Sequence, residues 1–310
     1  MEKSQNAGEG GKSLYSYCQR NYIFKFQKLV MILFLTVGIC YSYAQNNESD
    51  FRVTLTSDNT GVIITRYIGR GADVVIPNTI QGLPVKEIGY EAFVDEVIGF
   101  TSVDKKLTRV VIPEGVTKIG AQAFRACNSL ISVILPSTLT EIGGSAFADL
   151  PLLSNIELPI GLKVIEGNAF SRCVSLSSIN LPVGLVEIGS NAFEGSGLLS
   201  FPNPWPTGIT TIAEGLFENT RLSNVVIPEG ITIIGSSAFA YCRNLTNITL
   251  PSTISYIAIN AFTVCSSLTI VNIPESVQRI RFDFWVFRYS SNINLASQAR
   301  LRQLGYTHEF

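Results

Sequence analysis

The sequence repeats one pattern at a nearly constant interval. From Leu135 to Phe170 it reads LPSTLTEIGGSAFADLPLLSNIELPIGLKVIEGNAF, and the phrase LP..L..I....AF occurs twice there, with Pro136 and Pro159 23 residues apart. One active site has no reason to recur at a fixed interval. A structural unit that cannot bury its apolar face alone does recur, because only a stacked neighbour can cover that face. The chain is therefore predicted to fold as a solenoid of stacked coils.

Eight coils can be aligned on their prolines, and two further columns then fall into register. The prolines follow one another at steps of 22 to 24 residues: Pro113, Pro136, Pro159, Pro182, Pro206, Pro228, Pro251 and Pro274. Six residues later stands isoleucine: Ile119, Ile142, Ile165, Ile188, Ile212, Ile234, Ile257 and Ile280. Eleven residues later stands an aromatic residue: Phe124, Phe147, Phe170, Phe193, Phe217, Phe239, Phe262 and Trp285. Coils stacked at the strand spacing of about 4.8 Å place such like residues on one another inside the molecule.

A short strand is predicted before each proline. In segments such as LISVIL (130–135), LSSINL (176–181) and LTNITL (245–250) the last four residues alternate between outward and inward positions. Proline ends each strand, and a glycine two residues later often turns the chain. The pattern predicts one parallel sheet along one side of a curved solenoid.

The repeat L..L.LP..L..IG..AF..C.. resembles the BspA-like, or treponemal-type, leucine-rich repeat over residues 74–285. Residues 51–84 are similar to that family's N-terminal hairpin and first irregular repeat, which implies a hairpin cap over 45–73. Proteins of this family are typically exported bacterial surface proteins, and some are implicated in adhesion to host matrix proteins or to other cells. The resemblance thus implies a leucine-rich-repeat adhesin.

Residues 286–310 are predicted to cap the last coil. The segment 286–291 is expected to add a final strand, and 294–306 is predicted to be a helix with Asn294 as N-cap and Gly305 as its stop. Its inner side is expected to carry Leu295, Ala299, Leu301 and Leu304. An open solenoid needs such a cap to shield its last apolar face and its edge strand.

The first 44 residues have the order of a secretory signal. Residues 1–28 carry five basic and two acidic side chains, an apolar run follows from Leu29 to Cys40, and the small residues Ser42 and Ala44 come next. Cleavage after Ala44 is predicted. The cleaved protein is expected to be secreted or held at the cell surface, and the periplasm is the other compartment considered. A retained anchor and lipidation at Cys40 are the alternatives. The run is short for a membrane span, and no transmembrane segment is expected in the mature chain.

The net charge of the chain argues against nucleic acid as a partner. Removal of the leader takes five of 23 basic and two of 24 acidic residues, which leaves 18 and 22 and a net charge of −4. A nucleic acid is therefore not expected as a partner, because its phosphates attract basic surfaces.

The sequence offers few groups for catalysis or for metal binding. Four cysteines stand three residues after the phenylalanine column, where other coils place Leu150, Ser196 and Thr220: Cys127, Cys173, Cys242 and Cys265. They are interpreted as buried free thiols that serve as small apolar residues, and a disulfide framework is the alternative. The only histidine is His308. Glu141 and Glu187 share a column that is expected to be solvated. No enzymatic activity, metal or cofactor is predicted.

Two segments depart from the repeat. Residues 94–106 form an extra loop before the first aligned proline, and SFPNPWPTG (200–208) carries three prolines through an expected strand. Phe201 and Trp205 in the second segment are candidates for exposed binding anchors. The alternative is that they replace inward aliphatic residues in a deformed coil.

The outward positions of the predicted sheet are the candidate binding site. They carry mostly short polar side chains: Arg109, Ser132, Asn155, Glu157, Ser178, Asn180, Asn224, Asn247, Thr249 and Asn272. A pre-ordered sheet loses little entropy when it binds, so the sequence predicts that this face binds a macromolecule. A protein is the favoured partner, from the host extracellular matrix or from another cell's surface. The alternative is a structural or scaffolding protein of the envelope or periplasm that has no host ligand.

Overall fold

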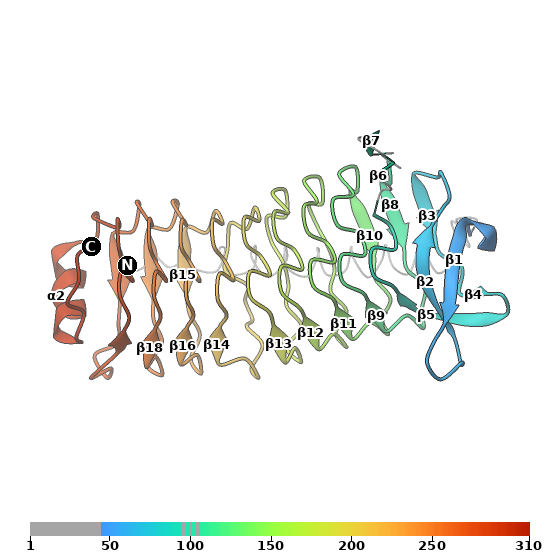
Figure 1. The fold of residues 1–310 in the computed structure, drawn as a ribbon. Helices are drawn as coiled ribbons and strands as arrows, with labels where there is room; N and C mark the ends of the chain where they lie inside the picture. Colours follow the sequence, from blue (N-terminus) through green and yellow to red (C-terminus); the bar gives the residue numbers. More distant parts are fainter. Residues whose placement is uncertain (1–44, 95–96, 99–100, 103–105) are drawn as a thin grey trace, which may run out of the picture. The chain divides into compact units, whose positions relative to one another are not determined.

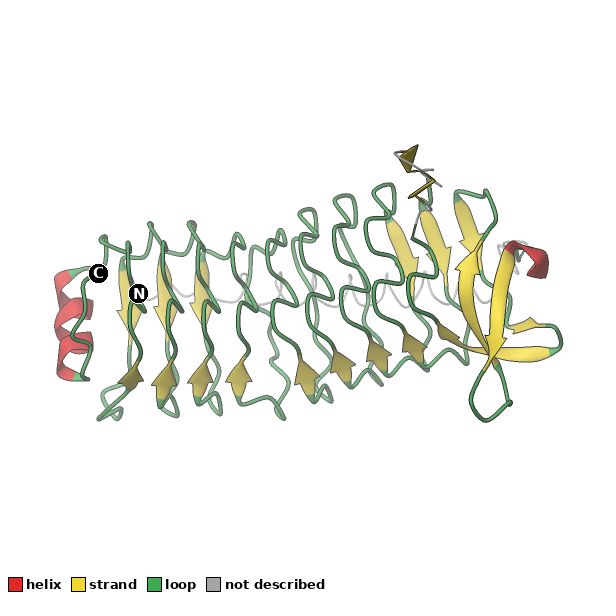
Figure 2. Cartoon of the chain, viewed as in Figure 1, coloured by secondary structure: helices red, strands yellow, loops and turns green. Residues whose placement is uncertain are grey.

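The computed structural model describes residues 45–94, 97–98, 101–102 and 106–310. The predicted export signal at 1–44 lies outside these residues. The chain from Gln45 onward forms a solenoid whose coils stack side by side (Figures 1 and 2), so the predicted fold class is confirmed. A 3-10 turn, Glu48–Asp50, precedes the antiparallel hairpin of β1 (Phe51–Leu55) and β2 (Val62–Tyr67) at the first coil.

One row of parallel strands follows the isoleucine column, and we call it the isoleucine row. Its bounds are β5 (Leu83–Ile88), β9 (Lys118–Ile119), β11 (Glu141–Ile142), β12 (Val164–Ile165), β13 (Glu187–Ile188), β14 (Thr211–Ile212), β16 (Ile233–Ile234), β18 (Tyr256–Ile257) and β20 (Arg281–Phe282). Ile142 pairs with Ile119 and Ile165, and all three are fully buried. The glycine after this isoleucine allows close stacking, because a Cβ on Gly143 would lie 2.7 Å from the backbone nitrogen of Ala121.

A second row, the pre-proline row, contains strands before five of the eight aligned prolines; the strands predicted before Pro159, Pro182 and Pro206, that of 176–181 included, do not form. The row consists of β3 (Asp73–Val75), β8 (Arg109–Val111), β10 (Ser132–Ile134), β15 (Asn224–Val226), β17 (Asn247–Thr249) and β19 (Ile270–Asn272). Val133 and Ile248 point inward and are buried, as predicted. The expectation of a single sheet is corrected, because parallel pairing falls into two rows on either side of the proline turn. The two-residue strands of the isoleucine row are too short to show period-two alternation.

The phenylalanine column lies between the end of one isoleucine strand and the start of the next pre-proline strand. Its rings are buried and stack from coil to coil, with centroids 4.7 to 5.9 Å apart from Tyr67 to Phe287. Backbone N–H groups in this column donate to carbonyl oxygens one coil further on, as from Phe124 to Ala146 at 2.9 Å and from Phe147 to Ala169 at 2.9 Å. Each coil therefore directs these N–H groups toward the C-terminal end.

The eighth coil is two residues longer than the sequence alignment assumes. Phe282, and not Ile280, pairs with Ile257, and Phe287, and not Trp285, stacks on Phe262. Trp285 is 47% exposed and has a φ of 56°, the left-handed conformation that Asn260 adopts two residues before Phe262. The predicted place of Trp285 in the aromatic column is thus wrong. Ile280 is still buried, which is why hydrophobicity alone did not reveal the shift.

The isoleucine row is interrupted between the coils of Ile188 and Ile212, and we call this interruption the seam; the pre-proline row has a longer interruption that includes it. In the described chain, β13 does not pair with β14, and β10 is separated from β15 by segments that form no strand. The segment between Leu198 and Pro206 has two extra residues, which change its length relative to the other coils. Its three prolines also lack the backbone N–H groups that would pair with a neighbouring strand. The phenylalanine column crosses the seam through the bond from Phe193 N–H to the Leu216 oxygen, 3.1 Å.

The C-terminal cap contains α2 (Leu295–Gln303), whose N-cap is Asn294, as predicted: its side chain accepts from the Ser297 N–H. Leu301 and Leu304 are buried, whereas Leu295 is 83% exposed and Ala299 is exposed, so these two were wrongly assigned to the inner side. Residues 286–291 form turns and not the expected strand, because Phe287 belongs to the aromatic column.

Two short elements lie outside the solenoid rows. β4 (Thr79–Ile80) pairs antiparallel with β5. Within the predicted extra loop at 94–106, β6 (Val97–Ile98) and β7 (Thr101–Ser102) pair antiparallel, and the remainder of that loop lies partly outside the described residues. No helix in the described part of the chain has the length and apolar character that a bilayer crossing requires.

Candidate interaction face

The outward side of the pre-proline row is the candidate interaction face. The ten predicted polar residues are all exposed or half-buried: Arg109, Ser132, Asn155, Glu157, Ser178, Asn180, Asn224, Asn247, Thr249 and Asn272. They do not share one continuous sheet. Arg109 and Ser132 lie on the first block of strands, and Asn224, Asn247, Thr249 and Asn272 lie on the second. The four between them lie on coils whose segments form no strand.

Polar side chains on the second block bond to one another. The amide of Asn247 donates to the side-chain oxygen of Asn224 at 2.9 Å, and that of Asn272 donates to the hydroxyl of Thr249 at 3.3 Å. These bonds consume part of the donor and acceptor capacity that a ligand could use. They also fix the side-chain orientations, so this part of the face is pre-ordered for binding.

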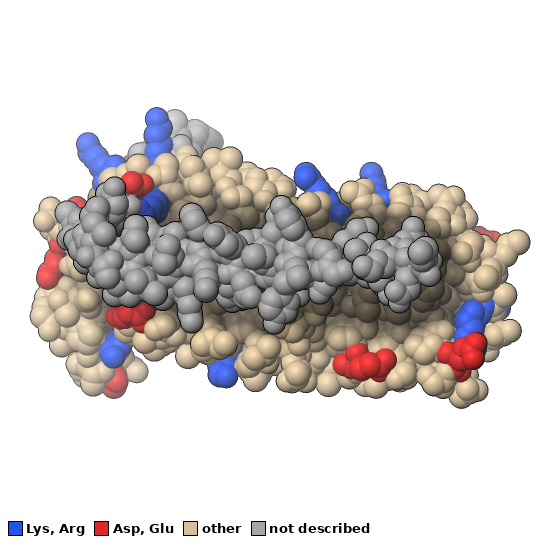
Figure 3. Space-filling view, turned by 180° about the vertical axis from the view of Figure 1, so that it is seen from behind, with Lys and Arg blue, Asp and Glu red and all other residues tan. Residues whose placement is uncertain are grey.

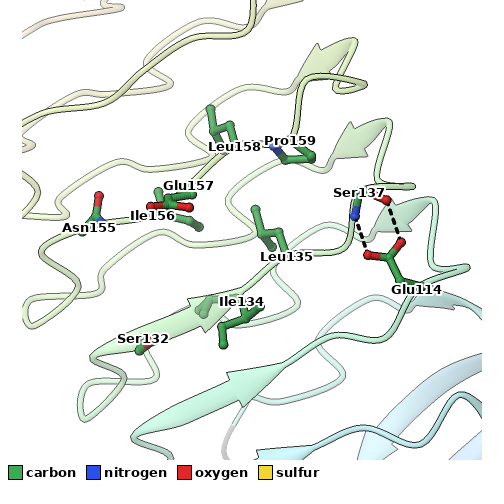
Figure 4. Close-up of a pocket in the computed structure, with 11 residues that line it drawn as sticks. Glu114, Ser132, Ile134, Leu135, Ser137, Asn155, Ile156, Glu157, Leu158 and Pro159 are labelled. Carbon is green, nitrogen blue, oxygen red and sulfur yellow. Dashed lines mark hydrogen bonds between the residues drawn. The ribbon is translucent and has the colours of Figure 1, made fainter. Parts of the chain in front are cut away.

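A first groove, of about 440 Å³, lies where the first block of strands ends (Figure 4). Ser132 comes from β10, and Asn155 and Glu157 come from the next coil. Ile134, which is 44% exposed, lines the same groove. The structure therefore brings three predicted residues together with one exposed aliphatic side chain.

The acidic residue at the edge of this groove has a structural partner. Glu114 accepts from the backbone N–H and from the hydroxyl of Ser137, both at 2.9 Å (Figure 4). These bonds lower the pKa of Glu114, the backbone bond having the larger effect. Glu229 and Ser252 repeat the arrangement. Both glutamates thus tie the turns of neighbouring coils together.

A second groove, of about 290 Å³, lies at the seam beside the start of β15. Phe201, Trp205 and Asn224 line it. Trp205 is only 7% exposed, its ring stacks on Phe201 at 5.1 Å, and its indole N–H donates to the Ile209 oxygen at 3.2 Å. The prediction of Trp205 as an exposed anchor is therefore corrected. Phe201 is half-buried and packs against Phe217, so both residues fill a deformed coil, as the alternative interpretation stated.

The predicted residues thus divide into three groups. Ser132, Asn155 and Glu157 line the first groove, and Asn224 lines the second. Ser178 and Asn180 lie on the coil between the grooves. Arg109, Asn247, Thr249 and Asn272 lie on the strand blocks outside both grooves. Sequence reasoning missed the grooves themselves, although the irregular length of the 182–206 coil indicated where strand pairing would fail.

The four columnar cysteines are buried and free, as predicted. Each thiol lies within hydrogen-bond distance of the carbonyl oxygen of the aromatic-column residue in an earlier coil, as for Cys173 and Phe147 at 3.0 Å. Burial raises the pKa of Cys173 to about 12 and that of Cys242 to about 11. Neutral buried thiols are poor nucleophiles and poor metal ligands.

Charged groups in the described chain are scattered. The face in Figure 3 shows isolated basic and acidic side chains along its edges, among large uncharged areas. Glu141, considered above with Glu187, forms an ion pair with Lys118 at 2.5 Å. Among the described residues, no group of three or more histidine, cysteine or acidic side chains is placed to hold a metal ion.

Comparison with known proteins places the repeat in a family. The model of the BspA type leucine rich repeat region matches residues 86–209 and 203–294 in six copies. A leucine-rich repeat protein of T. pallidum is 29% identical, over 86% of this chain and 98% of its own, with a TM-score of 0.45. A leucine-rich repeat protein from Bacteroides ovatus is 22% identical, over 82% and 81%, with a TM-score of 0.44. The pneumococcal vaccine antigen PcpA is 17% identical, over 79% and 85%, with a TM-score of 0.43. A comparison with curated proteins finds no match.

Proposed function

Because the chain belongs to the BspA-type leucine-rich repeat family, we propose that it is an exported bacterial protein that binds a protein ligand through its pre-proline face. Leucine-rich repeat proteins are protein-interaction scaffolds, and stacked coils of this kind offer extended surfaces for such contacts. The basic, apolar and small-residue order of residues 1–44 supports export.

The observation that carries the proposal is the pair of grooves on one face. The first groove combines the Ser132 hydroxyl, the Asn155 amide and the Glu157 carboxylate with the exposed Ile134 side chain. The second places Asn224 beside the half-buried Phe201. Both are built on packed coils, so little ordering entropy is lost when a partner binds. A protein surface that enters both grooves also covers Ser178 and Asn180 between them.

The proposed ligand is a host extracellular-matrix protein or a surface protein of another cell, which would make the protein an adhesin. The family resemblance supports this ligand class. The ten residues of the face carry mostly neutral polar groups, with one basic and one acidic side chain, which suits a protein surface better than a polyanion.

Surface plasmon resonance of the exported chain against purified extracellular-matrix proteins tests the proposal. Ser132→Arg and Asn224→Arg place a bulky charge in the first and second groove, and Asn180→Arg places one between them. Each is expected to weaken binding at least tenfold, about 1.4 kcal/mol. The matched control is Lys163→Glu, which changes a charge on the isoleucine-row side, where Lys163 donates to the Gly184 oxygen. Equal binding by all four variants, with binding lost on deletion of 94–106, would place the contact in the extra loop instead.

A scaffold of the envelope or periplasm is the second candidate, since the bonds between Asn224 and Asn247 also suit a face that only remains soluble. Protease treatment of intact cells separates the two. Cleavage of the chain on intact cells supports an exposed binding protein. Protection until the cells are lysed supports the scaffold.

A further inference from the structure

A third pocket, of about 350 Å³, lies at the turns that leave the phenylalanine column near the seam. In most coils six residues separate the column phenylalanine from the next buried leucine, as from Phe170 to Leu176 and from Phe239 to Leu245. Two consecutive turns, 193–198 and 217–222, have only five. The shorter turns sit between full-length neighbours, and the difference leaves a depression in the surface.

The floor and walls of this pocket follow from that difference in length. The short turns supply the floor, through Gly195–Gly197 and Asn219–Arg221. The full-length turns supply the walls, through Val174 on one side and Tyr241, Arg243 and Asn244 on the other. Two glycines in the floor add no side chains that could fill the space.

The charged side chains that line the pocket are both arginines, and neither has a partner in the part of the chain that the structure describes. Arg221 and Arg243 both line it, and no acidic residue does. Neither guanidinium forms an ion pair or a hydrogen bond with the described residues, whereas Arg172, in the neighbouring full-length turn 170–176, contacts both Asp149 and Glu194. An arginine pair without a carboxylate in a concave site is suited to a bidentate contact with an oxyanion.

Other residues that line the pocket provide hydrogen-bonding groups and an apolar surface in addition to the two charges. The amides of Asn219 and Asn244 are exposed and offer both donors and acceptors. The ring of Tyr241 is 41% exposed and presents an apolar face. The Ser196 hydroxyl in the floor is the only buried side-chain oxygen or nitrogen in the described chain that lacks a hydrogen-bond partner, so the floor is polar and incompletely satisfied.

From this geometry we propose that the pocket binds a carboxylated sugar of the uronic acid class. The carboxylate contacts Arg221 and Arg243, the ring hydroxyls bond to the two asparagine amides, and the apolar face of the sugar packs against Tyr241. A volume of about 350 Å³ falls within the range of small-molecule sites, roughly 300 to 1,000 Å³. The site is separate from both grooves of the pre-proline face and does not rest on the proposed protein ligand.

Isothermal titration calorimetry of the exported chain with trigalacturonic acid tests the site. Binding is expected for the acid and at least tenfold weaker binding for its methyl ester, which lacks the charge. Arg221→Gln, Arg243→Gln and Tyr241→Ala should each weaken binding of the acid at least fivefold. The matched control, Arg279→Gln, removes an exposed arginine that does not line the pocket and should leave binding unchanged.

The opposite results overturn the proposal. Equal binding of acid and ester, or equal loss in Arg279→Gln, would mean nonspecific attraction to basic residues. Binding of triglutamate as tight as that of the sugar, with Tyr241→Ala unaffected, would make the ligand an acidic peptide. No heat and no amide shift of Gly195 or Gly197 in NMR spectra of the unaltered protein would show that the pocket is unused. That last measurement stays decisive if a variant fails to fold.

Discussion

At the scale of single residues, the slot three positions after each phenylalanine has a hydrogen-bonding role that composition did not reveal. Cys265 lies 3.1 Å from the Phe239 oxygen, and Ser290, in the same slot of the next coil, donates to the Phe262 oxygen at 2.8 Å. The sequence predicted these cysteines as small apolar residues, which accounts for their burial. Thr220, which occupies this slot in another coil and donates to the Phe217 oxygen at 2.8 Å, was the available sign of a carbonyl partner, whereas the Ser196 hydroxyl in the same slot has no partner among the described residues.

The four buried thiols are expected to be protected in the native protein. When the chain from Gln45 onward is treated with Ellman's reagent at pH 8 and no reductant, fewer than one of its four thiols should react before unfolding, and four should react in denaturant, because each lies in the core. Fewer than two reactive thiols after unfolding would instead indicate disulfides.

Alkaline pH should destabilise the protein through the same residues. The folded-state pKa values of about 12 for Cys173 and about 11 for Cys242 lie above the ordinary value, so folding favours the protonated thiols. Their contribution to stability is complete below pH 9 and is lost as the pH rises toward 11 and 12. Denaturation midpoints should be measured between pH 8 and 11 for the unaltered protein and for the double variant Cys173→Ala/Cys242→Ala. Relative to its own value at pH 8, the midpoint of the unaltered protein should fall more than that of the variant. Parallel curves would contradict this.

The isoleucine column should carry a large share of local stability. Ile188→Ala is expected to lower the free energy of unfolding by about 2–5 kcal/mol through lost burial and a residual cavity, since Ile188 is only 7% exposed. Val186→Ala, two residues away and 61% exposed, is the control and should change it by less than about 0.5 kcal/mol. Equal denaturation midpoints for the two variants would show that the column is not core.

At the scale of elements, the C-terminal cap works by supplying side-chain oxygens to unpaired backbone donors. The Ser297 hydroxyl on α2 accepts from the Val271 N–H of the edge strand β19 at 3.0 Å. The Ser290 hydroxyl accepts from the Cys265 N–H, and the Tyr306 hydroxyl from the Phe287 N–H. These three hydroxyl groups thus replace the backbone carbonyl acceptors that a ninth coil would provide.

Ser297→Ala should therefore destabilise the last coils. It leaves the buried Val271 N–H without an acceptor, at a cost of about 1–3 kcal/mol, and hydrogen exchange of the Val271 amide should accelerate. Ser291→Ala, which alters an exposed serine in the same cap, should affect neither quantity. Unchanged exchange at Val271 in Ser297→Ala would mean that the edge is protected without this bond.

How far the elements could be predicted depended on whether the repeat held. Five of the eight pre-proline strands and the Asn294 N-cap were correct because each rests on local chemistry, alternation in one case and a capping oxygen in the other; the alternating segment 176–181 nevertheless forms no strand. Trp285 was misplaced because two additional residues after Pro274 leave the spacing of apolar residues nearly intact. The outward orientation of the ten candidate residues was predicted correctly, but the grooves depend on lost strand pairing, which no single residue encodes.

At the scale of the whole solenoid, the seam divides the coils into two blocks with different connections. On either side the coils share the isoleucine row and the phenylalanine column, whereas across the seam only the column continues, because β13 does not pair with β14. Trp205 packs at this point against Phe201 and Phe217. In a repeat protein, stability is approximately a sum over neighbouring contacts, so the seam is the weakest interface.

Unfolding should therefore begin at the seam. Trp285→Phe leaves Trp205 as the only tryptophan in the sequence, and its fluorescence should change at a lower guanidinium concentration than the loss of circular dichroism, because local opening precedes global unfolding. The unaltered protein, in which the exposed Trp285 adds a signal from the cap, provides the comparison. Coincident transitions in Trp285→Phe would mean that the two blocks unfold as one.

The bonds of the phenylalanine column also have an electrical consequence. From Tyr67 to Val264, successive N–H groups donate toward the C-terminal end and the carbonyl groups they reach point back. Peptide dipoles nearly cancel along a β-sheet but add where they are aligned, as they do in a helix. The column is therefore a row of parallel dipoles with its positive pole at the last coil. The same stacking that buries the rings therefore gives the two ends of this column opposite partial charges, while N–H groups of the isoleucine row, such as those of Thr140 and Gly143, donate the other way, to the preceding coil.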